Sequence, residues 1–155
     1  TVVYRADQAW NALTAAAPAG VREPYPSPPP SVAEWTALAD TDVLVAERES
    51  GIEPVPWSAV CFHAQQAAEK YLKALLAFRR IHPPRTHDTS ELLKHVRQAG
   101  IALPNMDQAC EQLKKYAVAA RYHMDPVQLP TTAEAGLPAL DAMRQIVRAA
   151  PAGMQ

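Results

Sequence analysis

Four polar side chains recur at helical spacing in the segment between residues 57 and 80. His63, Gln66, Lys70 and Lys73 follow one another at intervals of three or four residues, which places them on one face of a helix. His63 could accept or donate a proton near neutral pH, so this face could carry acid–base chemistry. The same row also fits the solvated edge of an amphipathic helix, with Gln66–Lys70 and Glu69–Lys73 as ordinary one-turn pairs.

A second candidate site is the run Arg121-Tyr122-His123, where a later helix ends. Arg121 presents a planar fork of donors that could clamp a phosphate or carboxylate, and the helix dipole alone also favours a cation there. Tyr122 could stack on a base, and His123 could titrate near neutral pH.

Asp42 lies near the buried stripe of an earlier helix, where a carboxylate needs a partner such as His63 or Arg121. If Asp42 lies just off that stripe, it is solvated instead.

The densest basic patch comes between these two candidates. Six groups that are or can be cationic fall within seventeen residues, namely Arg79, Arg80, His82, Arg85, His87 and His95. Such a patch could hold RNA or a nucleotide phosphate, and it could also be a solvated loop with cations at a helix end. No cluster of ligand residues has the helical register that a zinc ion needs, so we expect neither a metal nor a cofactor.

Five helices are expected to position these residues. Prolines separate segments of helical periodicity, and no segment alternates with period two, which predicts helices at 31–50, 57–80, 89–99, 105–122 and 132–150. Ser31 with Glu34 and Asp88 with Glu91 match N-terminal caps, and Gly100 ends the third helix. The short connections predict an all-α fold, an up-and-down four-helix bundle with an additional short helix.

Two of the expected helices carry features that test their boundaries and their buried faces. In the last helix Leu137 belongs to the buried stripe, and Pro138 means that the regular helix begins near Leu137 or is kinked there. The second helix is apolar over a wide arc, which places it centrally in a bundle or a dimer. We therefore expect a symmetric homodimer, with Tyr71 and Phe78 near the interface or the central core.

Length, charge and cysteine usage limit the class of protein. The chain has 155 residues and a formal charge of −1, which is one domain without an overall basic field to attract nucleic acid. Prolines mark 1–30 as a leader or arm, before a helical domain at 31–150 and a tail at 151–155.

No apolar run approaches the ~20 residues that span a bilayer, and no signal peptide is evident. Cys61 and Cys110 fall on apolar helix faces, so we expect buried free thiols in a cytoplasmic protein without membrane contact.

Three motifs resemble the HEPN domain family in order and spacing. The most specific is the string Phe62-His63-Ala64-Gln65-Gln66-Ala67-Ala68-Glu69-Lys70-Tyr71-Leu72-Lys73-Ala74-Leu75, which is similar to the signature helix of HEPN domains. Thr86-His87-Asp88 resembles the family's His-Asp segment, and Ala120-Arg121-Tyr122 its Ala-Arg-Tyr-Pro segment. Trp35, Ala39 and Asp42 fit the first helix more loosely, and the resemblance covers about residues 31–150.

The resemblance implies a small helical bundle that usually dimerises. Many bacterial members are encoded beside a minimal nucleotidyltransferase and act as the toxin of a toxin–antitoxin pair. Many are metal-independent endoribonucleases with an Arg-x(4–6)-His motif near the fourth helix, while others lack it and bind nucleotides or act as non-catalytic partners. Here the positions that would complete the motif after Arg121 hold Pro126, Val127 and Gln128, and His123 is only two residues away.

Three functions follow from these observations. The first is a homodimeric partner or toxin component of a nucleotidyltransferase pair that recognises nucleotide or RNA phosphate near Arg121; its candidate binding residues are Arg121, Tyr122, His63, Lys70, Arg80 and His87. The second is an active ribonuclease that uses Arg121 with His123, or Arg80 with His87, which match Arg-x(6)-His as text only. The third is a protein-interaction bundle without catalysis.

Overall fold

The computed structural model describes residues 29–119 and 130–155 of the chain. Within these ranges it contains five α-helices and a closing 3-10 helix, and no strand. The helices are α2 (Val32–Ser50), α3 (Trp57–Phe78), α4 (Thr89–Gln98), α5 (Asp107–Ala119) and α6 (Ala133–Ala149), followed by η2 (Ala150–Met154). The all-helical prediction is confirmed for the described ranges, and the expected leader, apart from its last residues, lies outside them.

Two helices begin at the polar capping residues that the sequence predicts. Ser31 Oγ accepts the N–H of Glu34 at 3.1 Å and Glu34 Oε2 accepts the N–H of Ser31 at 2.7 Å, which completes the expected capping box of α2. Asp88 caps α4 by accepting the N–H groups of Ser90 and Glu91. These bonds satisfy backbone donors that have no partner within the helix.

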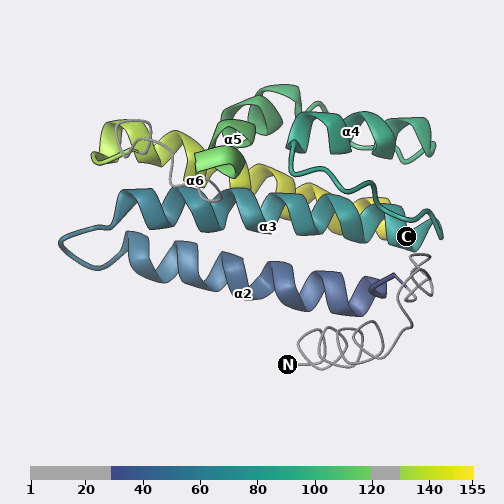
Figure 1. Ribbon diagram of the computed structural model, residues 1–155, viewed down its shortest axis with the longest axis horizontal. Coiled ribbons are helices and arrows are strands. Elements are labelled where there is room, and N and C mark those ends of the chain that lie inside the picture. The colour runs from purple at the N-terminus through teal and green to yellow at the C-terminus, as the bar shows by residue number, and fades with distance from the viewer. Residues whose placement is uncertain (1–28, 120–129) are drawn as a thin grey trace, which may run out of the picture.

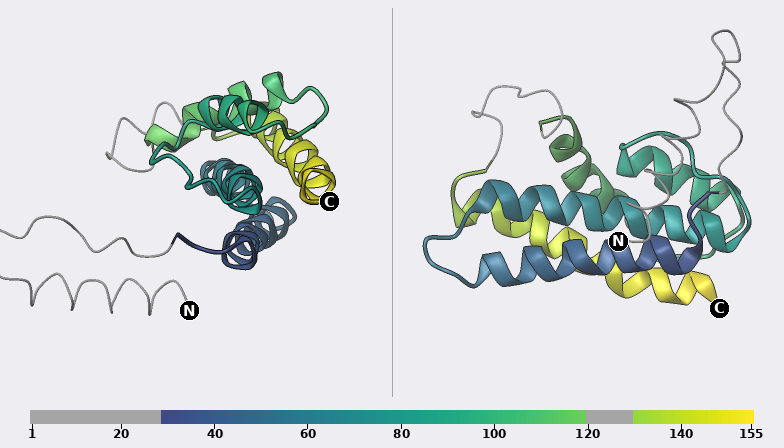
Figure 2. Two further views of the ribbon diagram at one scale, coloured as in Figure 1. Left: turned by 90° about the vertical axis from the view of Figure 1, so that its right-hand side faces the viewer. Right: turned by 60° about the horizontal axis from the view of Figure 1, so that its bottom comes forward.

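The α3 helix lies at the centre of the molecule. Figure 1 shows α2 antiparallel to α3, with α6 running along the other side of α3. Viewed along the helices in Figure 2, α2, α6 and the pair α4–α5 surround α3 on three sides. The α5 helix crosses α3 obliquely in both figures, so the expected up-and-down order is not confirmed.

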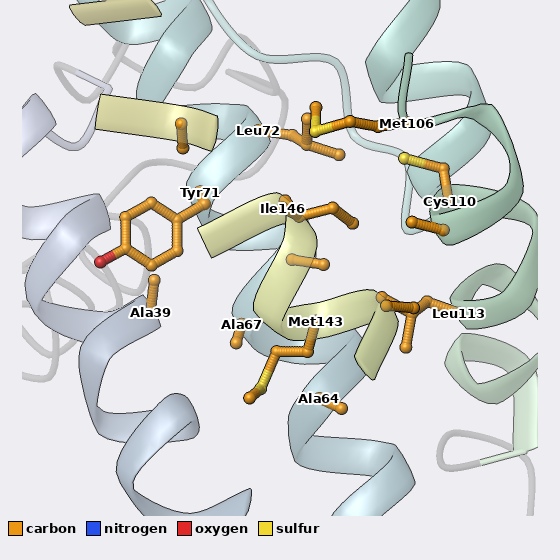
Figure 3. Close-up of a cluster of buried hydrophobic side chains, with 14 of the residues drawn as sticks. Ala39, Ala64, Ala67, Tyr71, Leu72, Met106, Cys110, Leu113, Met143 and Ile146 are labelled. Atoms are coloured by element: carbon orange, nitrogen blue, oxygen red, sulfur yellow. The ribbon is translucent and has the colours of Figure 1, made fainter. Parts of the chain in front are cut away.

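Apolar side chains from α3, α5 and α6 meet in a single core. Leu72, Leu113 and Ile146 are fully or almost fully buried there, as Figure 3 shows, and the small side chains of Ala64 and Ala67 let neighbouring helices approach α3 closely. Cys61 and Cys110 are both buried and free, as expected.

The wide apolar arc of α3 is covered within one chain. Tyr71 and two alanines on the same side of α3, Ala67 and Ala74, are buried within the chain, so a second copy is not required to cover them. Phe78 differs from them, with 38% of its surface exposed at the end of α3. The homodimer therefore stays a prediction.

The start of α6 corrects two expectations. The helix begins at Ala133 with Thr132 as its cap, so the expectation that the regular helix starts near Leu137 is wrong. Pro138 lies inside the helix. Leu137 is 45% exposed, and the buried stripe runs through Gly136 instead. The reason is Trp57, because a Cβ at position 136 would lie 2.4 Å from its Cε3 atom. The ring of Trp57 fills the space that a larger residue would occupy.

Candidate functional site

A buried carboxylate on α2 holds a histidine and a lysine of α3. Asp42 is 7% exposed, so the alternative that it is solvated is wrong. Its Oδ1 lies 2.8 Å from His63 Nδ1, and its Oδ2 accepts a hydrogen bond from Lys70 Nζ. His63 and Lys70 are seven residues apart on α3, which is about two turns, so both reach one acidic residue on the antiparallel neighbour. His63 was one of the two partners expected for Asp42.

This arrangement fixes the orientation of the His63 imidazole. A carboxylate only accepts hydrogen bonds, so Nδ1 carries the proton and donates to Asp42. In the neutral imidazole the Nε2 atom then carries the lone pair, and no group in the described ranges bonds to it. With 28% of its side chain exposed, His63 presents an oriented proton acceptor at the surface.

A second buried carboxylate, Glu69, collects three donors from α3 and the connection that follows it. Its Oε1 accepts from Lys73 Nζ at 2.9 Å and from His87 Nδ1 at 2.9 Å, while its Oε2 accepts from Gln65 Nε2 at 3.0 Å. Gln65 Nε2 also donates to the backbone oxygen of His87 at 3.0 Å. The connection after α3 therefore turns back along α3 and is fixed to it at His87.

Glu69 stays ionised although it is only 4% exposed. Burial by itself would raise the pKa of this carboxyl, but the hydrogen bonds from Lys73, Gln65 and His87 outweigh it and hold the pKa below its ordinary value. Lys73 is buried as well, and its Nζ lies 5.5 Å from the centre of the Trp35 ring. The pair is thus a buried ion pair, and the solvated-edge interpretation is wrong for Glu69 and Lys73.

We call the surface formed by these residues the α3 polar face: His63, Gln66, Lys70 and Lys73, with the supporting residues Asp42, Gln65, Glu69 and His87. Gln66 Nε2 donates to Gln65 Oε1 at 2.7 Å rather than pairing with Lys70. Both buried carboxylates thus bind one lysine and one histidine each. On this face two lysines balance the charges of the two carboxylates.

The structure brings together only some of the residues proposed from the sequence. Asp42, His63 and Lys70 are in direct contact, and His87 joins the same face through Glu69. Arg80 lies near the end of α3, about three turns or ~16 Å along the helix from Glu69, so it is not paired with His87. Arg121, Tyr122 and His123 lie outside the described residues.

Sequence reasoning did not select Glu69 and Gln65 as site residues. Their signal was the i, i+4 spacing of Gln65, Glu69 and Lys73 on a helix whose other flanks are apolar. The contact of Glu69 with His87 depends on how the connection folds, and nothing in the local pattern encodes it. Trp35 Nε1 is also buried and donates to no acceptor among the described residues.

The described ranges contain no group of three or more His, Cys, Asp or Glu residues that could hold a metal ion. None of their helices combines the length and the hydropathy needed to cross a bilayer.

Comparison with known proteins agrees with the motifs on α3. The HEPN domain matches residues 32–151, which covers all five described α-helices. Neither the curated proteins nor the solved structures gave a match. The matched region contains both buried carboxylates and every residue of the α3 polar face. A match over this much of the chain shows that the protein belongs to the HEPN domain family.

Proposed function

We propose that the α3 polar face binds the phosphate groups of a nucleotide or RNA. The observation that carries this proposal is the arrangement around Asp42, where a buried carboxylate holds His63 and Lys70 at the surface in fixed orientations. Lys70 Nζ has three donors, and Asp42 accepts one hydrogen bond from it, so donors remain for a phosphate oxygen. Side chains that are already ordered lose little further entropy when a ligand binds.

The proposed biological setting is a pair with a nucleotidyltransferase, in which this chain is the partner or the toxin. Membership of the HEPN family supports it, because many bacterial members of that family are encoded beside a minimal nucleotidyltransferase. We further propose that the chain acts as a homodimer. If a nucleotidyltransferase is encoded beside this chain, co-purification with it tests the first statement, and sedimentation at micromolar concentration tests the second. A monomer that does not bind the transferase would contradict both.

Binding can be tested with a fluorescent RNA oligonucleotide and matched lysine variants. Lys70→Gln should weaken binding by about 1–3 kcal/mol, the range for a charge-assisted hydrogen bond to phosphate. Lys114→Gln is the control, because this exposed lysine of α5 pairs with Glu111 away from the α3 polar face. Equal losses in both variants would mean that only net charge matters, and no loss in Lys70→Gln would refute the proposal. Arg121→Ala tests the expected contribution of Arg121, for which we predict a loss of similar size.

A second candidate function is metal-independent cleavage of RNA. The orientation of His63 by Asp42 favours it, because a neutral imidazole with an open Nε2 can accept the proton of a ribose 2′-hydroxyl as that oxygen attacks the adjacent phosphorus. The bond from phosphorus to the 5′-oxygen of the next nucleotide then breaks, which leaves a 2′,3′-cyclic phosphate, and the departing 5′-oxygen takes a proton from water. RNA should then be cleaved in the presence of EDTA, and His63→Ala should abolish cleavage. Cleavage that survives His63→Ala but not an Arg121→Ala, His123→Ala double variant would instead assign the reaction to those residues. Absence of cleavage by the unaltered protein would leave binding as the function.

A further inference from the structure

A cavity of about 630 Å³ lies between α5 and α6, outside the α3 polar face. Its volume falls within the range of small-molecule sites. The residues that line it recur every three or four positions on each helix, so one face of α5 and one face of α6 form opposite walls. The α5 wall carries Gln108, Glu111 and Gln112, and the α6 wall carries Pro138, Asp141 and Gln145.

The base of the cavity is apolar. Ala109 on α5 and Ala142 on α6 line it and are only 4% and 3% exposed, and Pro138 adds further apolar surface. Because alanine side chains are short, the space above them stays open between the longer polar side chains of the two walls. This base suits a methylene chain, which gains free energy when it leaves water.

The polar side chains of the cavity accept hydrogen bonds and carry negative charge. The described residues that line it include two carboxylates, Glu111 and Asp141, and no lysine, arginine or histidine. Asp141 Oδ1 lies 3.6 Å from Arg144 Nη1, whereas Arg144 donates two bonds of 2.7 Å to Glu47, so Asp141 keeps most of its acceptor capacity. The lining therefore repels anions such as phosphate and attracts a cation.

Glu111 and the glutamines supply the remaining acceptors. Glu111 accepts hydrogen bonds from Ser90 at 2.9 Å and from Lys114 at 3.0 Å, but its side chain is 57% exposed, and such surface contacts are weak enough to exchange with other donors. Gln108 and Gln145 form no side-chain hydrogen bond with any other described residue, so each has an open amide oxygen.

We propose that this cavity binds an aliphatic polyamine. The ammonium groups donate to the carboxylates on the two walls and to the amide oxygens, and the methylene segments between them lie on the alanine base. A metal ion fits less well, because the described residues contain no group of three or more His, Cys, Asp or Glu residues that could hold one. A polyamine uses both the apolar base and the carboxylates, whereas an inorganic cation uses only the carboxylates. This site goes beyond the proposed function, since no residue of the α3 polar face lines the cavity.

Calorimetric titration of the full-length chain with spermidine, at low ionic strength and without RNA, tests this proposal. Glu111→Gln and Asp141→Asn should each reduce the affinity about 3- to 10-fold, which lies between the usual values for exposed and for buried charged hydrogen bonds. Both side chains are more than half exposed, so these variants should fold, which circular dichroism verifies. Glu53→Gln is the matched control, because it removes one charge from an exposed carboxylate in the connection between α2 and α3, outside the cavity.

Two further cations separate a polyamine from other cationic ligands. Hexaamminecobalt(III) carries the same triple charge as spermidine but no methylene groups, so it should bind far more weakly. The proposal is overturned if spermidine does not bind, if hexaamminecobalt(III) binds equally well, or if Glu53→Gln loses as much affinity as Glu111→Gln. Normal spermidine binding by both cavity variants would also overturn it. A trilysine peptide that binds more tightly than spermidine would assign the cavity to a basic protein segment and reject the polyamine.

Discussion

Replacing Glu69 by glutamine should destabilise the protein strongly. Glu69→Gln leaves the ammonium of Lys73 buried without a counter-ion, and it leaves one amide oxygen where the carboxylate accepts from Lys73, His87 and Gln65 with two. Since both side chains of the ion pair are less than a tenth exposed, solvent cannot replace the lost carboxylate. Breaking one partner of a buried pair typically costs about 3–5 kcal/mol, and we expect this loss in the free energy of unfolding.

Urea denaturation at pH 7, followed by circular dichroism, measures this loss. The control is Glu111→Gln, because Glu111 also pairs with a lysine on its own helix, Lys114, but at an exposed position. That control should change stability far less. A double variant, Glu69→Gln with Lys73→Met, removes both charges and should recover most of the stability. A loss in Glu69→Gln below about 1 kcal/mol, or equal to that of the control, would refute the assignment of Glu69 and Lys73 as a buried ion pair.

The same pair predicts a pH dependence of stability. The pKa of Glu69 in the folded protein lies below its ordinary value of 4.5, so the unfolded chain binds the proton more readily. The contribution of Glu69 is therefore fully present above pH 4.5 and is lost as the pH falls through the folded-state pKa. Glu69→Gln should lack this part of the acid-induced loss. An identical slope in both proteins below that pH would contradict the shift.

Two further predictions concern the core. Gly136→Ala should destabilise the protein, although alanine favours helices, because its Cβ would lie 2.4 Å from Trp57 Cε3; a melting temperature that rises would show that the contact is relaxed. Burial raises the pKa of the Cys61 thiol to about 11 and that of Cys110 to about 12, so neither should react with a thiol reagent at pH 8 until the protein unfolds. Rapid labelling of the native protein would contradict that prediction.

Local sequence signals predicted the helices well. Prolines and polar caps mark where α2 and α4 begin, and these signals act over a few residues. The apolar arc of α3 indicated a central helix but did not indicate what covers it, because neighbouring helices of the same chain produce the same pattern as a dimer partner.

Contacts between distant segments limited the prediction of the candidate site. Asp42 and His63 could be paired from the sequence, because neighbouring antiparallel helices place them at one level. The contact between Glu69 and His87 requires the connection to turn back along α3, which depends on the packing of α4. Leu137 was misassigned for the same reason, since the bulk of Trp57 on another helix determines which residue of α6 faces inward.

The central position of α3 has a consequence for hydrogen exchange. Every other described helix packs on α3, so its amides can exchange only when the whole domain opens. The α2 helix packs almost entirely on α3, and its link to α6 includes the ion pair of Glu47 with Arg144. A sub-global opening that releases α2 would separate Asp42 from His63 and Lys70 while Glu69 keeps His87 and Lys73. Release of α2 alone thus breaks the pair of Asp42 with His63 and leaves the pair of Glu69 with His87 in place.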